Sequence, residues 1–238
     1  MSNESPGAPE ITLNREGAVD PVLVLTSEDW AAQVRQPGRA YFLVKRLFDF
    51  LATFFLVLFL LPFFASVMLL IYLDDRGPVF YRQTRVGKNG KPFTFYKFRS
   101  MVKNADQLKE SLANQNEADG PAFKIKNDPR ITRVGKFIRK TSIDELPQLL
   151  NVLKGDISLV GPRPHLPCEV EGYKPEYYRR LAAQPGLVCL REVSGRSRLS
   201  FEKWVELDLQ YLEHRSLRQD AKILLKAFKA VMKGDGAY

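Results

Sequence analysis

An uncharged apolar run over residues 50–73 constrains this chain more than any other feature. Its 24 residues carry no charged side chain, and that length is enough for a helix to cross a bilayer. Pro62 lies in the middle, where its missing N–H and its ring bend or break a helix. Basic residues flank both ends, and the positive-inside rule places such flanks on the same side of a membrane. A crossing helix and a re-entrant helix that turns at Pro62 both remain open on composition.

The two ends of this run carry further signals. Arg46 and Asp49 are three residues apart at its start, so they are predicted to pair on one helix face and to offset the cost of a carboxylate near hydrocarbon. Residues 74–78 (DDRGP) combine charges, a glycine and a proline. This segment is predicted to end the helix.

Charge is distributed unevenly along the chain. Residues 1–40 carry six acidic and three basic side chains, a net charge of −3, so the rest of this chain of formal charge +9 carries +12. A body this basic indicates polyanionic partners, which include nucleic acid, anionic lipid and nucleotide phosphates. The first 40 residues lack sustained periodicity and are predicted to form a flexible acidic tail. The only cysteines, Cys168 and Cys189, have no metal-ligand spacing and fit a reducing compartment.

A β-hairpin is predicted directly after the apolar helix. Residues 79–83 and 93–98 have the composition of strands, and Asn89–Gly90 between them is a strong turn signal. The period of two places Lys97 and Arg99 on one side of the second strand, where together they can hold a phosphate. Protection of a sheet edge by basic side chains is an equally good explanation.

Two adjacent carboxylates, Asp144 and Glu145, stand at the start of a predicted helix whose leucines recur at helical spacing. Ser142 with Glu145 three residues later matches a capping box, whereas Pro147 favours a helix that starts at Asp144. Either start places both acids near the positive end of a helix dipole, which also attracts phosphate. With the leucines anchored in a core, the pair is expected to face outward. An ordinary acidic first turn that stabilises a helix is the alternative.

Later segments add two candidates and a surface. Prolines on both sides of Arg163 stiffen its loop, which suits recognition of a diphosphate, although a sharp turn with a surface arginine is the simpler explanation. A predicted helix over residues 201–214 carries Asp208 beside its apolar face. The last helix, around residues 222–233, is amphipathic and rich in lysine. Such a helix lies on an anionic membrane or packs on its own domain.

Five motifs, taken in order, give the chain a family resemblance. They are residues 45–49 (KRLFD), 95–101 (FYKFRSM), 139–148 (RKTSIDELPQ), 161–164 (GPRP) and 234–238 (GDGAY). Over about residues 41–238 the chain thereby resembles the bacterial sugar transferase family of monotopic phosphoglycosyl transferases. One position departs from the pattern: many members place serine before the helix-breaking proline, and Leu61 stands there in this chain.

The resemblance implies an α+β fold in three parts. Residues 1–40 form the flexible tail, residues 41–76 a re-entrant membrane helix-break-helix, and residues 77–238 a small, mainly helical catalytic domain with a β-hairpin and amphipathic interface helices. A monotopic protein of the bacterial inner membrane follows, in contact with membrane lipids and with its catalytic domain facing the cytoplasm. A homodimer is compatible with this arrangement.

The implied reaction moves a sugar-1-phosphate from a UDP-sugar to undecaprenyl phosphate and releases UMP, in the first membrane step of exopolysaccharide, capsule or O-antigen assembly. The resemblance leans toward hexose donors such as UDP-galactose or UDP-glucose. By its place in the family motif, Asp144 is the nucleophile that carries the phosphosugar covalently, and Glu145 is its partner in binding Mg²⁺. This agrees with the chemistry, because a carboxylate attacks a diphosphate only where a metal and nearby cations screen their repulsion.

The same motif positions identify substrate contacts. Lys97, Arg139 and Arg163 are implied to bind phosphate or substrate, and Arg99 and Asp208 are weaker candidates for the same role. Each of these residues has an ordinary structural alternative, so their predicted role depends on the set of motifs.

Two other classes of function compete with the transferase. A membrane-anchored regulator that binds nucleic acid would explain the charge of +12, but the sequence shows no recognition-helix motif or aromatic stacking platform. A non-catalytic membrane scaffold would explain the apolar helix and the basic last helix. Neither explains the acidic pair, and the transferase prediction therefore includes no nucleic acid among its partners.

Overall fold

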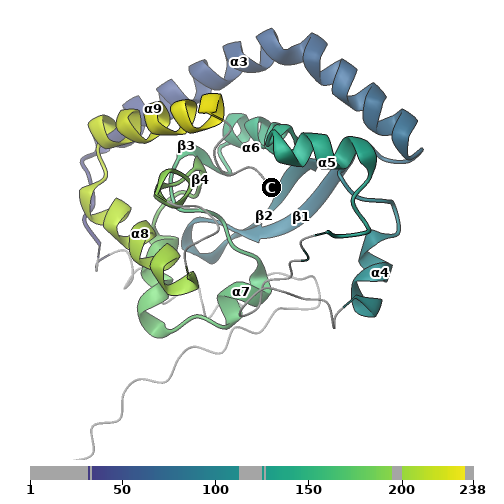
Figure 1. Cartoon of the computed structure of the whole chain (residues 1–238). Helices are drawn as coiled ribbons and strands as arrows, with labels where there is room; N and C mark the ends of the chain where they lie inside the picture. The colour runs from purple at the N-terminus through teal and green to yellow at the C-terminus, as the bar shows by residue number, and fades with distance from the viewer. Residues whose placement is uncertain (1–31, 33, 113–124, 126, 195–199, 234–238) are drawn as a thin grey trace, which may run out of the picture.

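The computed structural model describes residue 32 and residues 34–112, 125, 127–194 and 200–233, so the predicted acidic tail and the GDGAY motif lie almost wholly outside the described residues (Figure 1). With η marking 3₁₀ helices, the elements are α3 (Arg39–Asp74), β1 (Phe80–Val86), η1 (Lys88–Gly90), β2 (Pro92–Phe98), α4 (Ala105–Ser111), α5 (Arg133–Lys140), η3 (Ile143–Glu145), α6 (Gln148–Lys154), β3 (Ser158–Val160), α7 (Pro167–Glu171), η4 (Pro175–Ala182), β4 (Gly186–Val188), η5 (Leu190–Val193), α8 (Phe201–His214) and α9 (Leu217–Lys233). Many helices with two small sheets confirm the α+β class.

The longest element, α3, bends without breaking. It is one helix of 36 residues with Pro62 inside it, and in Figure 1 it arches over α9, α6 and α5. The hydroxyl of Ser66 donates to the carbonyl oxygen of Pro62 at 3.0 Å, and a serine bonded back by one turn bends a helix as a proline does. The prediction of a helix broken at Pro62 is therefore corrected to a continuous, bent helix. Ser66, one turn later, supplies the hydroxyl that is missing at Leu61.

Much of the surface of α3 is apolar and exposed. The helix is long and apolar enough to cross a membrane, and only 11% of its most apolar window is buried inside the protein. Large apolar side chains are exposed along its length: Leu43 is 72% exposed, Phe59 81% and Leu73 63%. A continuous apolar surface of this kind marks a place where lipid or another protein binds. The length and the exposed apolar surface of this helix are those of a helix that associates with a membrane.

Polar contacts attach the first half of α3 to the rest of the protein. Arg46 donates from Nη1 to the carbonyl oxygen of Val152 at 2.6 Å and from Nη2 to that of Leu153 at 2.8 Å, which caps the end of α6. Asp49 is buried and accepts a hydrogen bond of 2.6 Å from the hydroxyl of Ser158. The predicted pairing of Arg46 with Asp49 is therefore wrong: each side chain binds a separate segment of the domain.

The second half of α3 is held by apolar packing and by its last residue. Val67 and Ile71 are buried against Phe98 and Ile138, which belong to β2 and α5. The helix ends at Asp74 as predicted, and the carboxylate of Asp74 accepts a hydrogen bond of 2.9 Å from the backbone N–H of Val134. This carboxylate satisfies one of the donors at the start of α5. The end of the apolar helix therefore fixes the start of α5.

The hairpin forms where the sequence predicted it, with longer strands. β1 and β2 are antiparallel, with Arg85 opposite Phe93 and Tyr81 opposite Lys97. Asn89 has a φ of 56°, a left-handed conformation that asparagine tolerates better than most residues, so the turn signal is confirmed. The end of β2 approaches α5 so closely that a Cβ at Gly135 would lie 1.9 Å from the carbonyl oxygen of Ser100. Glycine is therefore required there, and it fixes the hairpin against α5.

The last helix packs with only part of its apolar face. Ile223 is 2% exposed, whereas Leu225 and Phe228 are 62% and 66% exposed. α9 lies beneath α3 in Figure 1, next to α6. The lysines that alternate with these residues, such as Lys222 and Lys226, are also exposed. Exposed apolar and basic side chains on one helix are typical of a helix at a membrane surface.

Candidate active site

The carboxylate pair lies in a 3₁₀ turn ahead of α6. Ser142 has a φ of 57° and its side chain forms no capping hydrogen bond, so the predicted capping box is wrong. The predicted helix start at Asp144 is corrected as well, because α6 begins at Gln148. Pro147 holds the N-cap position, where its missing N–H leaves no helical hydrogen bond unmade. A left-handed serine costs of order 1 kcal/mol, and such strain is common at functional sites.

The turn directs the two carboxylates differently from the prediction. Ile143 and Leu146 pack against the apolar cluster around Ile138, which draws η3 into the domain. Asp144 is consequently only 7% exposed, and the side chain of Glu145 is 24% exposed. The expectation that the pair faces outward is therefore wrong, because the apolar residues that flank the acids are anchored on both sides.

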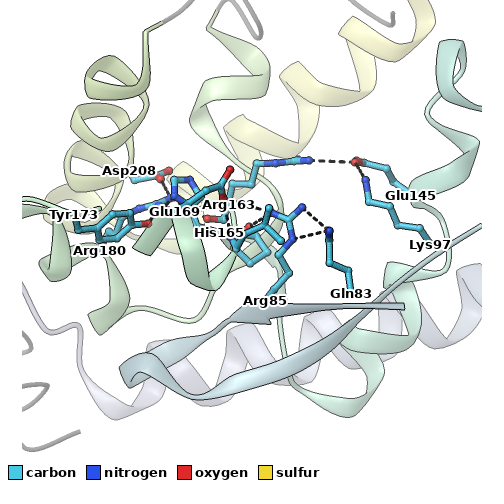
Figure 2. Close-up of polar contacts among 12 residues, drawn as sticks. Gln83, Arg85, Lys97, Glu145, Arg163, His165, Glu169, Tyr173, Arg180 and Asp208 are labelled. Carbon is cyan, nitrogen blue, oxygen red and sulfur yellow. Dashed lines mark hydrogen bonds and ion pairs between the residues drawn. The ribbon is translucent and has the colours of Figure 1, made fainter. Parts of the chain in front are cut away.

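Two cations hold Glu145 (Figure 2). Its Oε1 accepts a hydrogen bond of 2.9 Å from Lys97 Nζ and one of 3.3 Å from Arg163 Nη2. Burial favours the neutral acid, but Lys97 and Arg163 outweigh it and hold the pKa of Glu145 well below its usual range. Arg163 also donates from Nη1 to Glu192 at 2.8 Å. Glu145 is therefore an ionised group that positions two cations.

Asp144 differs from its neighbour in having no such partner. Within the described part of the chain, no side chain forms a hydrogen bond or ion pair with the carboxylate of Asp144. Burial raises its pKa and the charge of Glu145 adds to that effect, while Lys97, Arg139 and Arg163 oppose it. Cations close by, together with free carboxylate oxygens, leave Asp144 available to attack a phosphorus atom or to ligate a metal.

The substrate-binding candidates fall into groups. Lys97 and Arg163 contact Glu145 directly, and Arg139, partly exposed at the end of α5, acts on the charge of Asp144 without touching it. The structure thus brings three of the five candidates to the carboxylate pair, from β2, α5 and the loop after β3.

Asp208 belongs to a buried network behind Arg163. Its carboxylate pairs with Arg180, and both side chains are almost fully enclosed. Arg180 also donates to the carbonyl oxygen of Arg163 at 2.9 Å and to the hydroxyl of Tyr173. Figure 2 shows Arg163 between this network and Glu145. Asp208 therefore fixes the loop that presents Arg163 and does not itself reach the carboxylate pair.

Arg99 is directed away from the carboxylate pair. The strand period predicted that it shares a face with Lys97, but β2 ends at Phe98, so Arg99 lies beyond the strand that the prediction assumed. Arg99 instead pairs with Asp75 at 3.3 Å, directly after α3, and it fills the space beside Gly77. Its contacts fasten the end of the apolar helix to the hairpin.

Sequence reasoning missed Arg85, which supports the same loop as Arg180. Arg85 Nη1 donates to the carbonyl oxygen of Pro164 at 3.0 Å, and two of its nitrogens bond Gln83. Burial and the charge of Arg163 lower the pKa of Arg85 to about 10. The hairpin register was the available signal, because Arg85 and Lys97 lie on the same face of the sheet once Asn89–Gly90 is taken as the turn.

The buried His165 is a second group that the sequence left unassigned. Its Nδ1 is 2.6 Å from the hydroxyl of Tyr173, and burial together with Arg180 holds its pKa well below the ordinary value. The imidazole is therefore neutral and serves to pack the loop after Arg163.

The carboxylate pair suits a divalent cation bound together with substrate. Across the described residues, no three His, Cys, Asp or Glu side chains gather into a metal-binding group. Magnesium is commonly held by one or two carboxylates together with substrate phosphates, so a full protein cage is not needed. The free oxygens of Asp144 and the remaining oxygen of Glu145 provide that minimal set.

Comparison of the sequence with known proteins identifies the family of this chain. A model of the family described as bacterial sugar transferase matches residues 40–234. The chain is 47% identical over 204 residues to "Undecaprenyl-phosphate galactose phosphotransferase" of Salmonella typhimurium, which covers 82% of this chain and 42% of that protein. It is 51% identical over 164 residues to "Galactosyl transferase CpsE" of Streptococcus agalactiae, covering 68% of this chain and 36% of that protein.

Relatives of similar length are also found. "Exopolysaccharide production protein ExoY" of Rhizobium meliloti is 40% identical over 200 residues, with 82% of this chain and 88% of that protein covered. The chain therefore spans less than half the length of the first two relatives and most of the third. A family model that matches residues 40–234 includes every candidate site residue. The chain belongs to the bacterial sugar transferase family.

Proposed function

We propose that this protein transfers a hexose-1-phosphate from UDP-galactose or UDP-glucose to undecaprenyl phosphate and releases UMP. The observation that carries the proposal is the contrast within the carboxylate pair: Asp144 is buried and unpartnered, while Glu145 binds Lys97 and Arg163 beside it. Relatives named as undecaprenyl-phosphate galactose and glucose phosphotransferases support both the donor and the acceptor.

The first step is a substitution at the phosphorus atom that bears the sugar. An oxygen of Asp144 forms a bond to this phosphorus, and the bond to the oxygen that bridges the two phosphates breaks, so UMP leaves with that oxygen. The product on the protein is an aspartyl phosphosugar. A Mg²⁺ bound by Asp144, Glu145 and the diphosphate would neutralise charge on the phosphate oxygens.

The surrounding cations lower the barrier by stabilising the charge that develops on the diphosphate. Lys97 and Arg163 are already oriented by Glu145, and Arg139 adds charge at the end of α5. Preorganised cations of this kind need no rearrangement when the leaving group departs. Arg163 is in turn fixed by Arg85 and Arg180 through the backbone of its loop.

In the second step the phosphate of the lipid acceptor attacks the same phosphorus and releases the carboxylate of Asp144. The acceptor is membrane-bound, so the site has to lie close to the headgroups. The C-terminal half of α3 packs on the same apolar cluster as the residues that flank Asp144. This supports a monotopic arrangement in which residues 41–76 enter and leave one face of the inner membrane, with the catalytic domain of residues 77–238 on the cytoplasmic side. In this arrangement Leu225 and Phe228 of α9 reach the lipid.

The test incubates purified full chain with Mg²⁺, undecaprenyl phosphate and a panel of UDP-sugars, and measures UMP. UDP-galactose or UDP-glucose is expected to give UMP, and donor alone is expected to leave one phosphohexose on Asp144 that mass spectrometry detects. Asp144→Asn is expected to lose both signals, by about 10⁴-fold in rate. A folded protein that releases no UMP with any donor, or an Asn variant that turns over normally, refutes the proposal. Sizing of the same preparation in lipid nanodiscs determines whether the protein forms a homodimer.

A further inference from the structure

A cavity of about 200 Å³ lies between the first turns of α3 and the domain beneath them. Its lining comes from α3, from the segment around β3, from the residues just before β4, from α8, and from the link between α8 and α9. The polar side chains among the lining residues include Tyr41, Lys45, Arg46, Asp49, Ser158 and Arg215. None of the residues that surround Asp144 lines this cavity.

The cavity has more positive charge than its carboxylates balance. Lys45 forms an ion pair of 2.9 Å with Asp220, whereas Arg46 donates only to the carbonyl oxygens at the end of α6. Arg215 is 3% exposed and donates to the carbonyl oxygen of Arg35 and the side chain of Gln36. In the described part of the chain, no carboxylate lies within ion-pair distance of Arg215, and its Nη1 forms no hydrogen bond.

A buried guanidinium with a free donor that lines a cavity is a place for an anion. Burying a cation is expensive unless it is paired, and neutral oxygens only partly replace its hydration. Arginine is well suited to phosphate because its planar donors match two phosphate oxygens. The charge and the free donor of Arg215 are therefore better satisfied by a bound phosphate than by an empty cavity.

The surroundings of the cavity select an amphiphilic ligand. The residues of α3 between those that line the cavity are apolar and exposed, with Leu43 72%, Leu47 60% and Phe48 54% exposed. In the membrane arrangement proposed above, these side chains contact acyl chains while the cavity behind them holds a polar group. A ligand with a phosphate and acyl chains satisfies both surfaces.

We propose that this cavity binds the phosphate of an anionic phospholipid, at a site separate from that of the acceptor lipid. The proposal rests on the proposed membrane position of α3. The acceptor phosphate has to reach Asp144, and none of the residues that hold Glu145 beside it lines the cavity. The seven residues of α6, a helix on the order of 10 Å long, lie between Asp144 and Gly155 at the cavity. The bound phospholipid joins the first turns of α3 to the link between α8 and α9, so it sets how firmly the catalytic domain is attached to the membrane helix.

The experiment uses delipidated full chain in detergent and measures lipid adducts by native mass spectrometry. Dioleoylphosphatidylglycerol is expected to give a one-to-one adduct and to raise the melting temperature. Dioleoylphosphatidylcholine and inorganic phosphate are expected to bind at least tenfold more weakly, because the first adds a cation and the second lacks acyl chains. Arg215→Gln is expected to lose at least tenfold in phosphatidylglycerol affinity, and Arg215→Lys less. Arg82→Gln, which removes one exposed strand charge, serves as the matched control and is expected to bind as the wild type does.

Hydrogen exchange provides a measurement that does not depend on a variant. Nanodiscs with phosphatidylglycerol are expected to protect residues 41–49 and 158–160 more than phosphatidylcholine nanodiscs do, with no change in α5. Equal binding of inorganic phosphate and phosphatidylglycerol would show a site for free anions. An adduct that is unchanged in Arg215→Gln, or protection that is absent from both segments, would show that the lipid binds elsewhere. Each of these results overturns the proposal. UMP release measured on the same wild-type samples separates this site from the reaction. Loss of UMP with the adduct retained rejects the transferase and leaves the lipid site standing.

Discussion

Two neighbouring regions differ in how their charged side chains are paired. One is the carboxylate turn of residues 142–147. The other is the arginine network behind it, which consists of Arg163, Arg180, Glu192 and Asp208. In the network each guanidinium has a carboxylate partner, and Arg180 and Asp208 are almost fully enclosed. In the turn, Asp144 is also buried, at 7% exposed, but its carboxylate has no partner among the described residues. The two regions therefore differ in role. The network holds its charges in fixed ion pairs, whereas the turn leaves the carboxylate of Asp144 unpaired and available to a substrate.

The largest effect that tests this difference is expected at Lys97. Lys97→Met removes a cation that acts on both carboxylates, and the loss of one preorganised charge at a reaction centre lowers the rate by about 10²–10³-fold. The measurement is the rate of UMP release at saturating donor. Lys203→Met, which removes an exposed lysine that pairs with Glu206, is the matched control and is expected to keep the rate within about twofold. Similar losses in both variants would show that the position of the charge does not matter.

The network is expected to respond mainly in stability. Asp208→Asn leaves Arg180 buried without its partner, and breaking such a pair costs about 3 kcal/mol, which urea unfolding measures. Activity is expected to fall less than in Lys97→Met, because Asp208 acts only through the loop of Arg163. The double variant Asp208→Leu/Arg180→Met removes both charges and is expected to recover part of the stability. A double variant less stable than the single one would contradict this account of the network.

The two carboxylates are expected to affect stability with opposite signs. The pKa of Glu145 is depressed in the folded protein, so its charge stabilises the fold above the ordinary value of 4.5, and this contribution is lost as pH falls through the folded value. Glu145→Gln is therefore destabilised at pH 7 and approaches the wild type in acid. The pKa of Asp144 is raised, so stability is present below its ordinary value of 3.8 and is lost as pH rises through the folded value.

It follows that Asp144→Asn is more stable than the wild type at pH 7, and that this advantage disappears in acid. Urea unfolding of both variants between pH 3 and pH 7 checks the two signs. Shifts of the same sign in the two variants would show that the carboxylates share one role.

The smallest effect is expected where charges are exposed. Lys174 and Glu202 pair at 3.0 Å with side chains 57% and 70% exposed. Solvent screens such a pair, so Lys174→Gln is expected to leave the melting temperature and UMP release unaltered. Thermal unfolding checks this, and a change comparable to that of Asp208→Asn would mean that exposure does not separate the two kinds of pair.

The sequence predicted the helices and strands of this fold better than the contacts between them. The apolar helix, its end at Asp74 and the turn at Asn89 follow from local chemistry, and the structure agrees with each. The partners of Arg46 and Asp49 did not follow, because spacing along a helix shows which residues share a face but not what packs against that face.

The same distinction holds at the site. Motif positions identified Asp144, Glu145, Lys97 and Arg163, and the structure brings them together. The burial of Asp144 was missed, because it depends on the apolar residues beside it finding a core formed by distant segments. Arg85 was missed although the hairpin register places it on the face of Lys97, because its contact with the loop of Arg163 spans 79 residues and the register does not show that contact.

The hydrogen bond between Asp74 and the first turn of α5 has a mechanical consequence. α5 leads within a few residues to Asp144, the proposed nucleophile, and its start is bound to the end of the apolar helix. A displacement of that helix along the bilayer normal would therefore also displace the carboxylate of Asp144. Membranes of graded acyl length are therefore expected to change turnover, because the end of the helix and the start of α5 move together.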